Sequence, residues 1–176
     1  MLIDVEKTYH PDVCNFYFNE DVLGADKAEY ADLQTKNASV LLENILKIGG
    51  ITEVLLTRDM LYVKKDSDAR FEELSGQILA LVDEFDFSYF KDFDFSKQDK
   101  MGLINAVVES QIRPFLKADG GDIKVLRADD GILYVKLTGR CSGCVHAKQT
   151  LKNIVEAYIK KYVPEIKAVM GEDDDA

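Results

Sequence analysis

Two cysteines three positions apart, Cys141 and Cys144, are the residues of this chain best suited to chemistry. They fall in the stretch GRCSGCVHAKQTL, after an alternating apolar segment and before a segment with helical spacing. If the first cysteine lies in a turn and the second at the start of a helix, both sulfurs can converge on one metal or cluster edge. The helix dipole then favours thiolate over thiol. Gly139 and Gly143 relieve crowding around the pair. The order strand, pair, helix therefore predicts a metal, cluster or redox site.

The spacing alone leaves several chemistries open, because zinc, iron-sulfur, copper and dithiol redox sites all use C-x-x-C. A structural zinc site needs four protein ligands, and the chain has no second C-x-x-C. We expect His146 to be an ordinary histidine of the first helical turn rather than a ligand. We expect Cys14, in VCNFYF, to be a small buried residue of a strand. The pair therefore supplies half of a four-thiolate cluster site.

A symmetric pair of chains completes the ligand set most simply, with Cys141 and Cys144 of each chain around one cluster on the two-fold axis. A cluster held in this way bridges two subunits, and it can leave when the dimer opens or when partner thiols replace one pair. This is the chemistry of a carrier and not of an enzyme. The alternative is a thiol-disulfide oxidoreductase, but Arg140 stands where an aromatic residue is expected, Ser142-Gly143 replaces Gly-Pro, and no β-α-β unit precedes the pair.

Length and composition narrow the class of protein further. The 176 residues suit one ordinary domain or two small ones, and 47% apolar residues allow a buried core. The net charge of −10, without a basic stripe, argues against a nucleic-acid partner. No apolar run approaches the roughly 20 residues of a membrane helix, and the start lacks the pattern of a signal or transit peptide. We expect a soluble, unprocessed protein, and the three cysteines favour a reducing compartment over a disulfide framework.

The first 86 residues predict a small α+β domain with the order β-β-α-β-β-α. Two strands are joined through His10-Pro11-Asp12, and a helix follows with Asn37 as its N-cap and Gly49-Gly50 as its stop. Two more strands meet at Arg58-Asp59, and Asp68 is expected to cap the last helix. Apolar residues at helical spacing mark the buried faces of the two helices: Leu41, Leu42, Ile45, Leu46, Phe71, Leu74, Ile78, Leu81, Val82 and Phe85.

Residues 99–170 predict a second α+β domain with the order α-β-β-α and a final strand in EIKAVM. Pro114 must kink or restart the first helix, because proline lacks an N–H and crowds the preceding turn. Asp130-Gly131 joins a hairpin, the cysteines follow its second strand, and Pro164 ends the last helix. The helices are marked by Ile104, Val107, Val108, Ile112 and Phe115, and by Leu151, Ile154, Val155, Tyr158, Ile159 and Tyr162.

Two further segments connect and end these domains. In residues 87–98 aromatic residues alternate with charges, so we expect a linker that packs its aromatic side chains on one domain; a short edge strand is the alternative. The last residues, 171–176, form an acidic run without apolar anchors, which predicts a frayed, solvated tail.

These motifs resemble those of a known family. The stretches RPFLKADGGDIKVL and DGILYVKLTGRCSGCVHAKQTLKNIVEAYIKKYVPEIKAV resemble the Nfu domain, the C-terminal module of NifU-type iron-sulfur proteins. The matching features are Arg113-Pro114, the run from Asp119 to Asp122, Leu-Thr-Gly before Cys141, the cysteine pair, Thr150-Leu151 and Val163-Pro164-Glu165. The first half resembles the Nfu N-terminal domain through His10-Pro11-Asp12, FYF and KIGGITEVLLTRDMLYVKK.

The resemblance implies a carrier that receives an iron-sulfur cluster from assembly proteins and passes it to recipient apo-proteins. In this family the cluster is typically [4Fe-4S] rather than [2Fe-2S]. It implies that Cys141 and Cys144 of each subunit bind the cluster. It also implies the bacterial cytoplasm, or the mitochondrial matrix for a processed eukaryotic chain. Many members have Pro-Ser-Ser or a similar small polar run after the second cysteine, where this chain has Val145-His146-Ala147. The lability of the cluster is expected to depend on these three residues.

Overall fold

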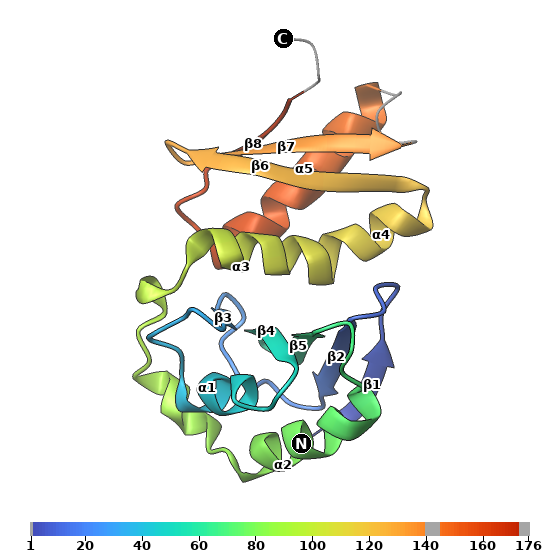
Figure 1. The fold of residues 1–176 in the computed structure, drawn as a ribbon. Helices are drawn as coiled ribbons and strands as arrows, with labels where there is room; N and C mark the ends of the chain where they lie inside the picture. The colour runs from blue at the N-terminus through green and yellow to red at the C-terminus, as the bar shows by residue number, and fades with distance from the viewer. Residues whose placement is uncertain (1, 140–144, 173–176) are drawn as a thin grey trace. The chain divides into compact units, whose positions relative to one another are not determined.

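The computed structural model of the chain describes residues 2–139 and 145–172, and it divides into two compact units, Met1–Leu103 and Ile104–Ala176. Each unit combines helices with its own β-sheet, which confirms the predicted α+β class (Figure 1). The acidic excess belongs to the first unit. Residues 104–176 contain equal numbers of acidic and basic side chains, so residues 1–103 carry the whole net charge of −10. The domain boundaries predicted from the sequence, 1–86 and 99–170 with a linker at 87–98, remain a proposal about which segments fold independently.

The first unit is a five-stranded antiparallel sheet with the order β1-β2-β5-β4-β3. Helices α1 and α2 pack against one face of this sheet (Figure 1). The core between the layers contains the predicted residues Leu41, Leu42, Ile45, Phe71, Leu74, Ile78 and Val82, whereas Leu46, Leu81 and Phe85 are partly buried at its margin. The elements are β1 (Leu2–Lys7), β2 (Val13–Phe18), β3 (Glu29–Asp32), α1 (Val40–Leu46), β4 (Ile51–Leu56), β5 (Met60–Lys65) and α2 (Phe71–Glu84).

Strand β3 is an element that the sequence pattern did not predict. It has four residues and carries a charge at each end, so it lacks the apolar alternation of a half-buried strand. Its first residue, Glu29, is nevertheless 1% exposed, and its carboxylate accepts the backbone N–H of Ser39 at 2.5 Å. Burial, only partly offset by the hydrogen bonds from Ser39, raises the pKa of Glu29 to about 7.

Both predicted helix caps in this unit were wrong. Ser39, not Asn37, caps α1, and its hydroxyl accepts the N–H of Leu42 at 3.3 Å. Helix α2 begins after Arg70, not after Asp68, and its N-cap side chain makes no capping hydrogen bond. A capping residue must precede the first helical residue directly. The backbone path places Ser39 directly before α1 and Arg70 directly before α2, so neither predicted residue is in the capping position.

The segment after α2 forms two short 3-10 helices, η1 (Phe87–Lys91) and η2 (Phe95–Lys97), so the alternative of an edge strand was wrong. Its phenylalanines pack on the first unit, as predicted: Phe90 belongs to the core, and Phe87, Phe93 and Phe95 lie against it. Gln98 follows and fixes the segment to the edge of β3. Its side-chain amide accepts the N–H of Tyr30 at 2.8 Å and donates to the carbonyl of Ala28 at 2.9 Å.

The second unit has a three-stranded sheet with the order β6-β7-β8, in which β6 and β7 are antiparallel and β7 and β8 are parallel. Figure 1 shows α5 and the helical segment 104–118 on one side of this sheet. The final strand predicted in EIKAVM is therefore confirmed. The elements are α3 (Lys100–Val107), which enters this unit at Ile104, the π-helix η3 (Val108–Ile112), α4 (Arg113–Ala118), β6 (Gly121–Asp129), β7 (Ile132–Gly139), α5 (Val145–Tyr162) and β8 (Ala168–Gly171).

Pro114 has the predicted effect on the first helical segment of this unit. The chain widens into the π-helix η3 and restarts as α4, with proline in its first turn, where a missing N–H costs nothing. Because the π-helix lies between them, the buried face of α4 is not the face that the spacing of α3 predicts. Phe115, expected on the buried face, is 67% exposed, and Leu116 is buried in its place.

The hairpin turns at the predicted Asp130-Gly131, and both residues have positive φ (46° and 77°), as a two-residue hairpin turn of type I′ requires. The register pairs Ile123 with Leu137 and Val125 with Val135 on the face toward the helices. Of the predicted tail, Gly171 ends β8 and Glu172 forms an ion pair with Arg127 at 2.5 Å, so these two residues are not frayed. Residues 173–176 lie outside the described part of the chain.

Candidate functional site

The cysteine pair lies in the connection between β7 and α5. Strand β7 ends at Gly139 and helix α5 begins at Val145, so the predicted order of strand, pair and helix is confirmed on both sides. Cys141 and Cys144 themselves, with Arg140 and Gly143, lie outside the described residues. His146 belongs to the first turn of α5, as expected, and its side chain also lies outside the described part.

A tight backbone contact fixes the start of this connection. Gly139 has φ +74°, a conformation that favours glycine, and it pairs with Gly121 in the hairpin. A Cβ atom at Gly139 would lie 2.4 Å from the carbonyl oxygen of Gly120 and 3.1 Å from the Cα of Gly121. Gly120 also has a positive φ, 76°, where α4 gives way to β6. The Asp-Gly-Gly-Asp run is thus the turn that the sequence predicted, and it packs against the residue that leads to the cysteines.

Ion pairs hold the strand that carries this turn. Asp122 lies 3.0 Å from Arg113 Nε and 2.7 Å from Lys117 Nζ, both on α4. Arg113 also forms an ion pair with Glu109 and donates to the carbonyl of Ile123 at 2.7 Å. Partial burial alone would raise the pKa of Asp122. The hydrogen bonds from Lys117 and from its neighbour's N–H, together with the charges of Arg113 and Lys117, outweigh that effect and lower it.

The sequence pattern did not identify this ion-pair network as a unit. Arg113 and Asp122 were noted only as parts of the family resemblance, and Glu109 and Lys117 were not singled out. One signal was available, because Glu109, Arg113 and Lys117 follow one another at intervals of four and so share one side of a regular helix. Their contacts with Asp122 and Ile123 position β6.

Helix α5 is anchored to the sheet along the side that follows the pair. Val155 and Ile159 are fully buried, and Val169 of β8 is buried with them. The carboxylate of Glu156 accepts the N–H of Val169 at 3.2 Å and forms an ion pair with Lys160 at 2.5 Å. These contacts set the direction of α5, whose first residue, Val145, directly follows Cys144 in the sequence. The unpaired N–H groups at a helix start can donate hydrogen bonds to a thiolate and so stabilise its negative charge.

The third cysteine is far less suited to metal binding. Cys14 lies in β2 with 1% exposure, as predicted, and its thiol donates to the carbonyl of Glu6 at 3.3 Å. Burial raises the pKa of the Cys14 thiol to about 11. A thiol with this pKa stays protonated at neutral pH, and the thiolate is the form that binds metals.

Among the residues whose side chains the structure describes, 4–139 and 149–172, no three histidine, cysteine, aspartate or glutamate side chains are grouped so that they could hold a metal ion. Within residues 2–139 and 145–172, no helix is both long and apolar enough to cross a membrane. The cysteine connection therefore remains the candidate site.

Comparisons with known proteins cover both units. The family model described as "NifU-like domain" matches residues 104–170, and the model described as "Scaffold protein Nfu/NifU N terminal" matches residues 3–88. NifU-like protein 4, mitochondrial, of Arabidopsis thaliana is 30% identical over 189 residues, which cover 99% of this chain and 67% of the relative. NFU1 iron-sulfur cluster scaffold homolog, mitochondrial, of Drosophila erecta is 26% identical over 188 residues, which cover 100% of this chain and 66% of the relative.

The chain thus spans about two thirds of the length of these relatives. Among solved structures, the crystal structure of a protein from Staphylococcus aureus aligns with a TM-score of 0.41 at 18% identity, covering 46% of this chain and 96% of that one. The two family models together match most of the chain, in the order in which the two units occur. With the Arabidopsis relative, they show that this chain belongs to the Nfu/NifU family of scaffold proteins.

Proposed function

We propose that this protein is an iron-sulfur cluster scaffold and carrier, and that Cys141 and Cys144 bind the cluster. The observation that carries the proposal is the position of the C-x-x-C pair between a fixed strand end and the start of α5, in a chain whose family members are named iron-sulfur cluster scaffolds. Cys14 is buried with a raised pKa, so one chain offers two suitable thiolates. An iron-sulfur cluster is commonly held by four.

Two chains complete the ligand set, and the cluster, a [4Fe-4S] cluster in this proposal, then bridges a homodimer. The cluster is cargo: assembly proteins deliver it, and recipient apo-proteins take it up when their thiolates replace one pair of cysteines. Thiolate exchange of this kind needs no acid-base or nucleophilic catalyst, so the proposal is for a carrier and not for an enzyme. The mitochondrial names of the relatives support the matrix as its compartment, and a bacterial cytoplasmic location stays a prediction.

Cysteine variants test the assignment. Anaerobic reconstitution with iron and sulfide should give a brown protein, and the double variant Cys141→Ala, Cys144→Ala should stay colourless. The matched control is Cys14→Ala, which removes the remaining thiol and should keep the cluster. Equal cluster yield from the double variant and the unaltered protein would refute the assignment.

The alternative function, thiol-disulfide exchange, also uses a pair between a strand and a helix. The strand before the pair, β7, is the second strand of an antiparallel hairpin, and the β-α-β unit that it forms with α5 and β8 follows this hairpin and does not precede the pair. Reduction of insulin disulfides by dithiothreitol, with and without the protein, separates the two functions. The carrier proposal predicts no acceleration by the protein, together with activation of an apo-enzyme by its reconstituted form. Acceleration of insulin reduction without cluster transfer would favour the oxidoreductase.

A further inference from the structure

Strand β8 covers only the first half of its neighbour β7. It is parallel to β7 and pairs with Ile132–Val135, whereas β7 continues to Gly139. Val135 presents its carbonyl to the β8 side, so Leu137, two residues further along, presents its backbone groups to the same side. Among the described residues, no strand pairs with Leu137 on this side. Such an edge is a template for a further extended segment, and it leads toward the cysteine connection.

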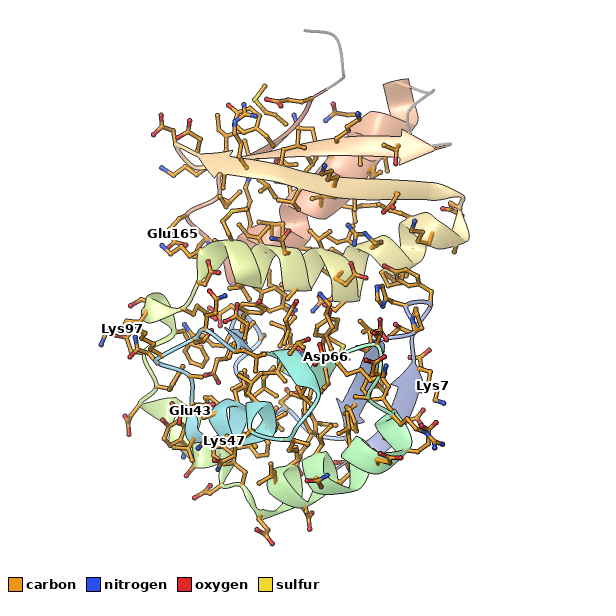
Figure 2. The ribbon with its side chains drawn as sticks, in the orientation of Figure 1. Lys7, Glu43, Lys47, Asp66, Lys97 and Glu165 are labelled. Carbon is orange, nitrogen blue, oxygen red and sulfur yellow. The ribbon has the colours of Figure 1, made fainter. Side chains whose placement is uncertain are left out.

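The residues that follow β8 continue along this edge. Glu165, labelled in Figure 2, precedes β8 at the turn end of the hairpin, where its carbonyl oxygen lies against Gly131. The strand then runs away from that turn, in the direction of β7. The N–H of Glu172 donates to the carbonyl of Val135 at 2.9 Å, which carries the ladder one residue past β8. In the same register, Asp174 would be the next donor, to the carbonyl of Leu137.

Glu172 also shows which face these residues present. Its carboxylate forms an ion pair with Arg127 at 2.5 Å, and the Arg127 guanidinium lies 3.8 Å from the ring centre of Tyr134. Tyr134 alternates along β7 with fully buried residues, so it lies on the face of the sheet away from the helices. Because side chains alternate along a strand, Asp174 would share this face with Glu172, and its two neighbours would lie on the other face.

Both faces offer positive charge along this path. On the face away from the helices, Lys124 and Lys136 stand directly opposite each other in the register of β6 and β7. Like charges in such a pair destabilise a sheet, and the carboxylate of Asp174 would offset this repulsion. On the other face, Lys152 lies one turn of α5 before Glu156, whose carboxylate contacts β8. Aspartate is depleted in strands, so these lysines rather than strand propensity would hold the extension.

We propose that residues 173–175 extend β8 along the edge of β7 and bring three carboxylates close to the cysteine pair, where they weaken its hold on the cluster. Asp175 then lies opposite Gly139, two residues before Cys141. Neighbouring strands are about 4.8 Å apart and two residues span at most about 7 Å, so the backbones of Asp175 and Cys141 lie within about 12 Å. Charges still interact at this distance, which is close to the Debye length.

The inference rests on the carrier proposal and deepens it. A [4Fe-4S] cluster held by four thiolates is an anion, so nearby carboxylates lower the affinity of the site for it. The same carboxylates cancel the charge of the neighbouring lysines, which would otherwise favour an anion. The extension therefore favours release of the cluster to a recipient.

The placement is tested on the full chain without a cluster, labelled with ¹⁵N and ¹³C. It predicts nuclear Overhauser contacts between residues 173–175 and residues 137–139, and slow hydrogen exchange of the Asp174 amide. Absence of these contacts would overturn the proposal. In a mixture of labelled and unlabelled chains, the contacts should lie within one chain. Contacts only between chains would overturn the proposal in favour of a second copy at this edge.

The effect on release is tested with a charge-neutral variant, which combines Asp173→Asn, Asp174→Asn and Asp175→Asn. After anaerobic reconstitution, this variant should lose its cluster to the uncharged iron chelator bipyridyl about threefold more slowly than the unaltered protein at low salt. The difference should shrink at about 1 M salt, because salt screens these charges. The matched control makes the same change in net charge on exposed residues of the first unit and should leave the rate within about 1.5-fold: Glu20→Gln, Asp68→Asn and Glu84→Gln.

Equal rates of cluster loss in the charge-neutral variant and the unaltered protein would overturn the proposal, and so would equal slowing by the control variant. Both variants keep Cys141 and Cys144, so their cluster yields should equal that of the unaltered protein. A failure of the carrier proposal would appear instead as a cluster that does not depend on these cysteines. The placement test needs no cluster, so the two failures are distinguishable.

Discussion

Replacement of Gly139 by alanine tests whether the backbone contact before Cys141 fixes the second unit. The left-handed conformation of Gly139, φ +74°, costs an alanine about 1–2 kcal/mol. The new Cβ would also lie 2.4 Å from the carbonyl oxygen of Gly120. This neighbour is backbone and has no rotamer with which to move away, so overpacking adds roughly 1–3 kcal/mol. The free energy of unfolding of the second unit should therefore fall by about 2–5 kcal/mol.

A second glycine provides the matched control. Gly76 lies within α2, and a Cβ there would meet nothing within 4 Å. Gly76→Ala should raise the free energy of unfolding of the first unit by about 0.5–1 kcal/mol, because glycine weakens a helix interior. Urea unfolding followed by NMR of amides in β4 and β5, and separately in β6 and β7, reports the two units. If Gly139→Ala leaves the β6–β7 amides within about 0.5 kcal/mol of the unaltered protein, the contact does not constrain the fold as described.

Three further predictions follow from single side chains. Because the pKa of Glu29 is raised, the folded protein keeps the proton on this carboxyl to higher pH than the unfolded chain does. The free energy of unfolding should therefore fall as pH rises from about 4.5 to about 7. Urea titrations should show this loss, and Glu29→Gln should abolish it. The pKa of Asp122 is lowered, so its effect on the pH dependence of stability has the opposite sign. The ionised carboxylate stabilises the fold above the pKa of the unfolded state, and this stabilisation is lost on acidification. The free energies of unfolding of Asp122→Asn and the unaltered protein should therefore converge as pH falls below about 4. Cys14 should react with iodoacetamide at pH 8 far more slowly than Cys141 and Cys144, and peptide mass spectrometry that found equal alkylation of all three would contradict its burial.

The sequence predicted the structural elements that depend on the backbone preferences of one or two neighbouring residues. Asp130-Gly131 fixes the hairpin because both positions require positive φ, and Pro114 breaks the helix because it lacks an N–H. Strand β3 escaped prediction because its pairing with β4, and the shielding of Glu29, come from residues distant in sequence. The exposure of Phe115 escaped as well, because the π-helix before it shifts the helical phase.

The candidate site also has features that the sequence predicts and features that it does not. The strand, the helix and the inert Cys14 were predictable, because alternation, helical spacing and residue type are local properties. The contact between Gly139 and Gly120 was not predictable, because it depends on how α4 delivers the chain to β6. The pairing of Arg113 and Lys117 with Asp122 likewise joins a helix to a strand and has no fixed sequence spacing.

The central claim is that one chain holds half of a cluster site, and native mass spectrometry of the anaerobically reconstituted protein tests it most directly. The expected species is a dimer that carries one cluster with about four irons. The double variant, Cys141→Ala with Cys144→Ala, should be colourless and should not form this species. A cluster-loaded monomer, or a dimer with a complete cluster on each chain, would contradict it.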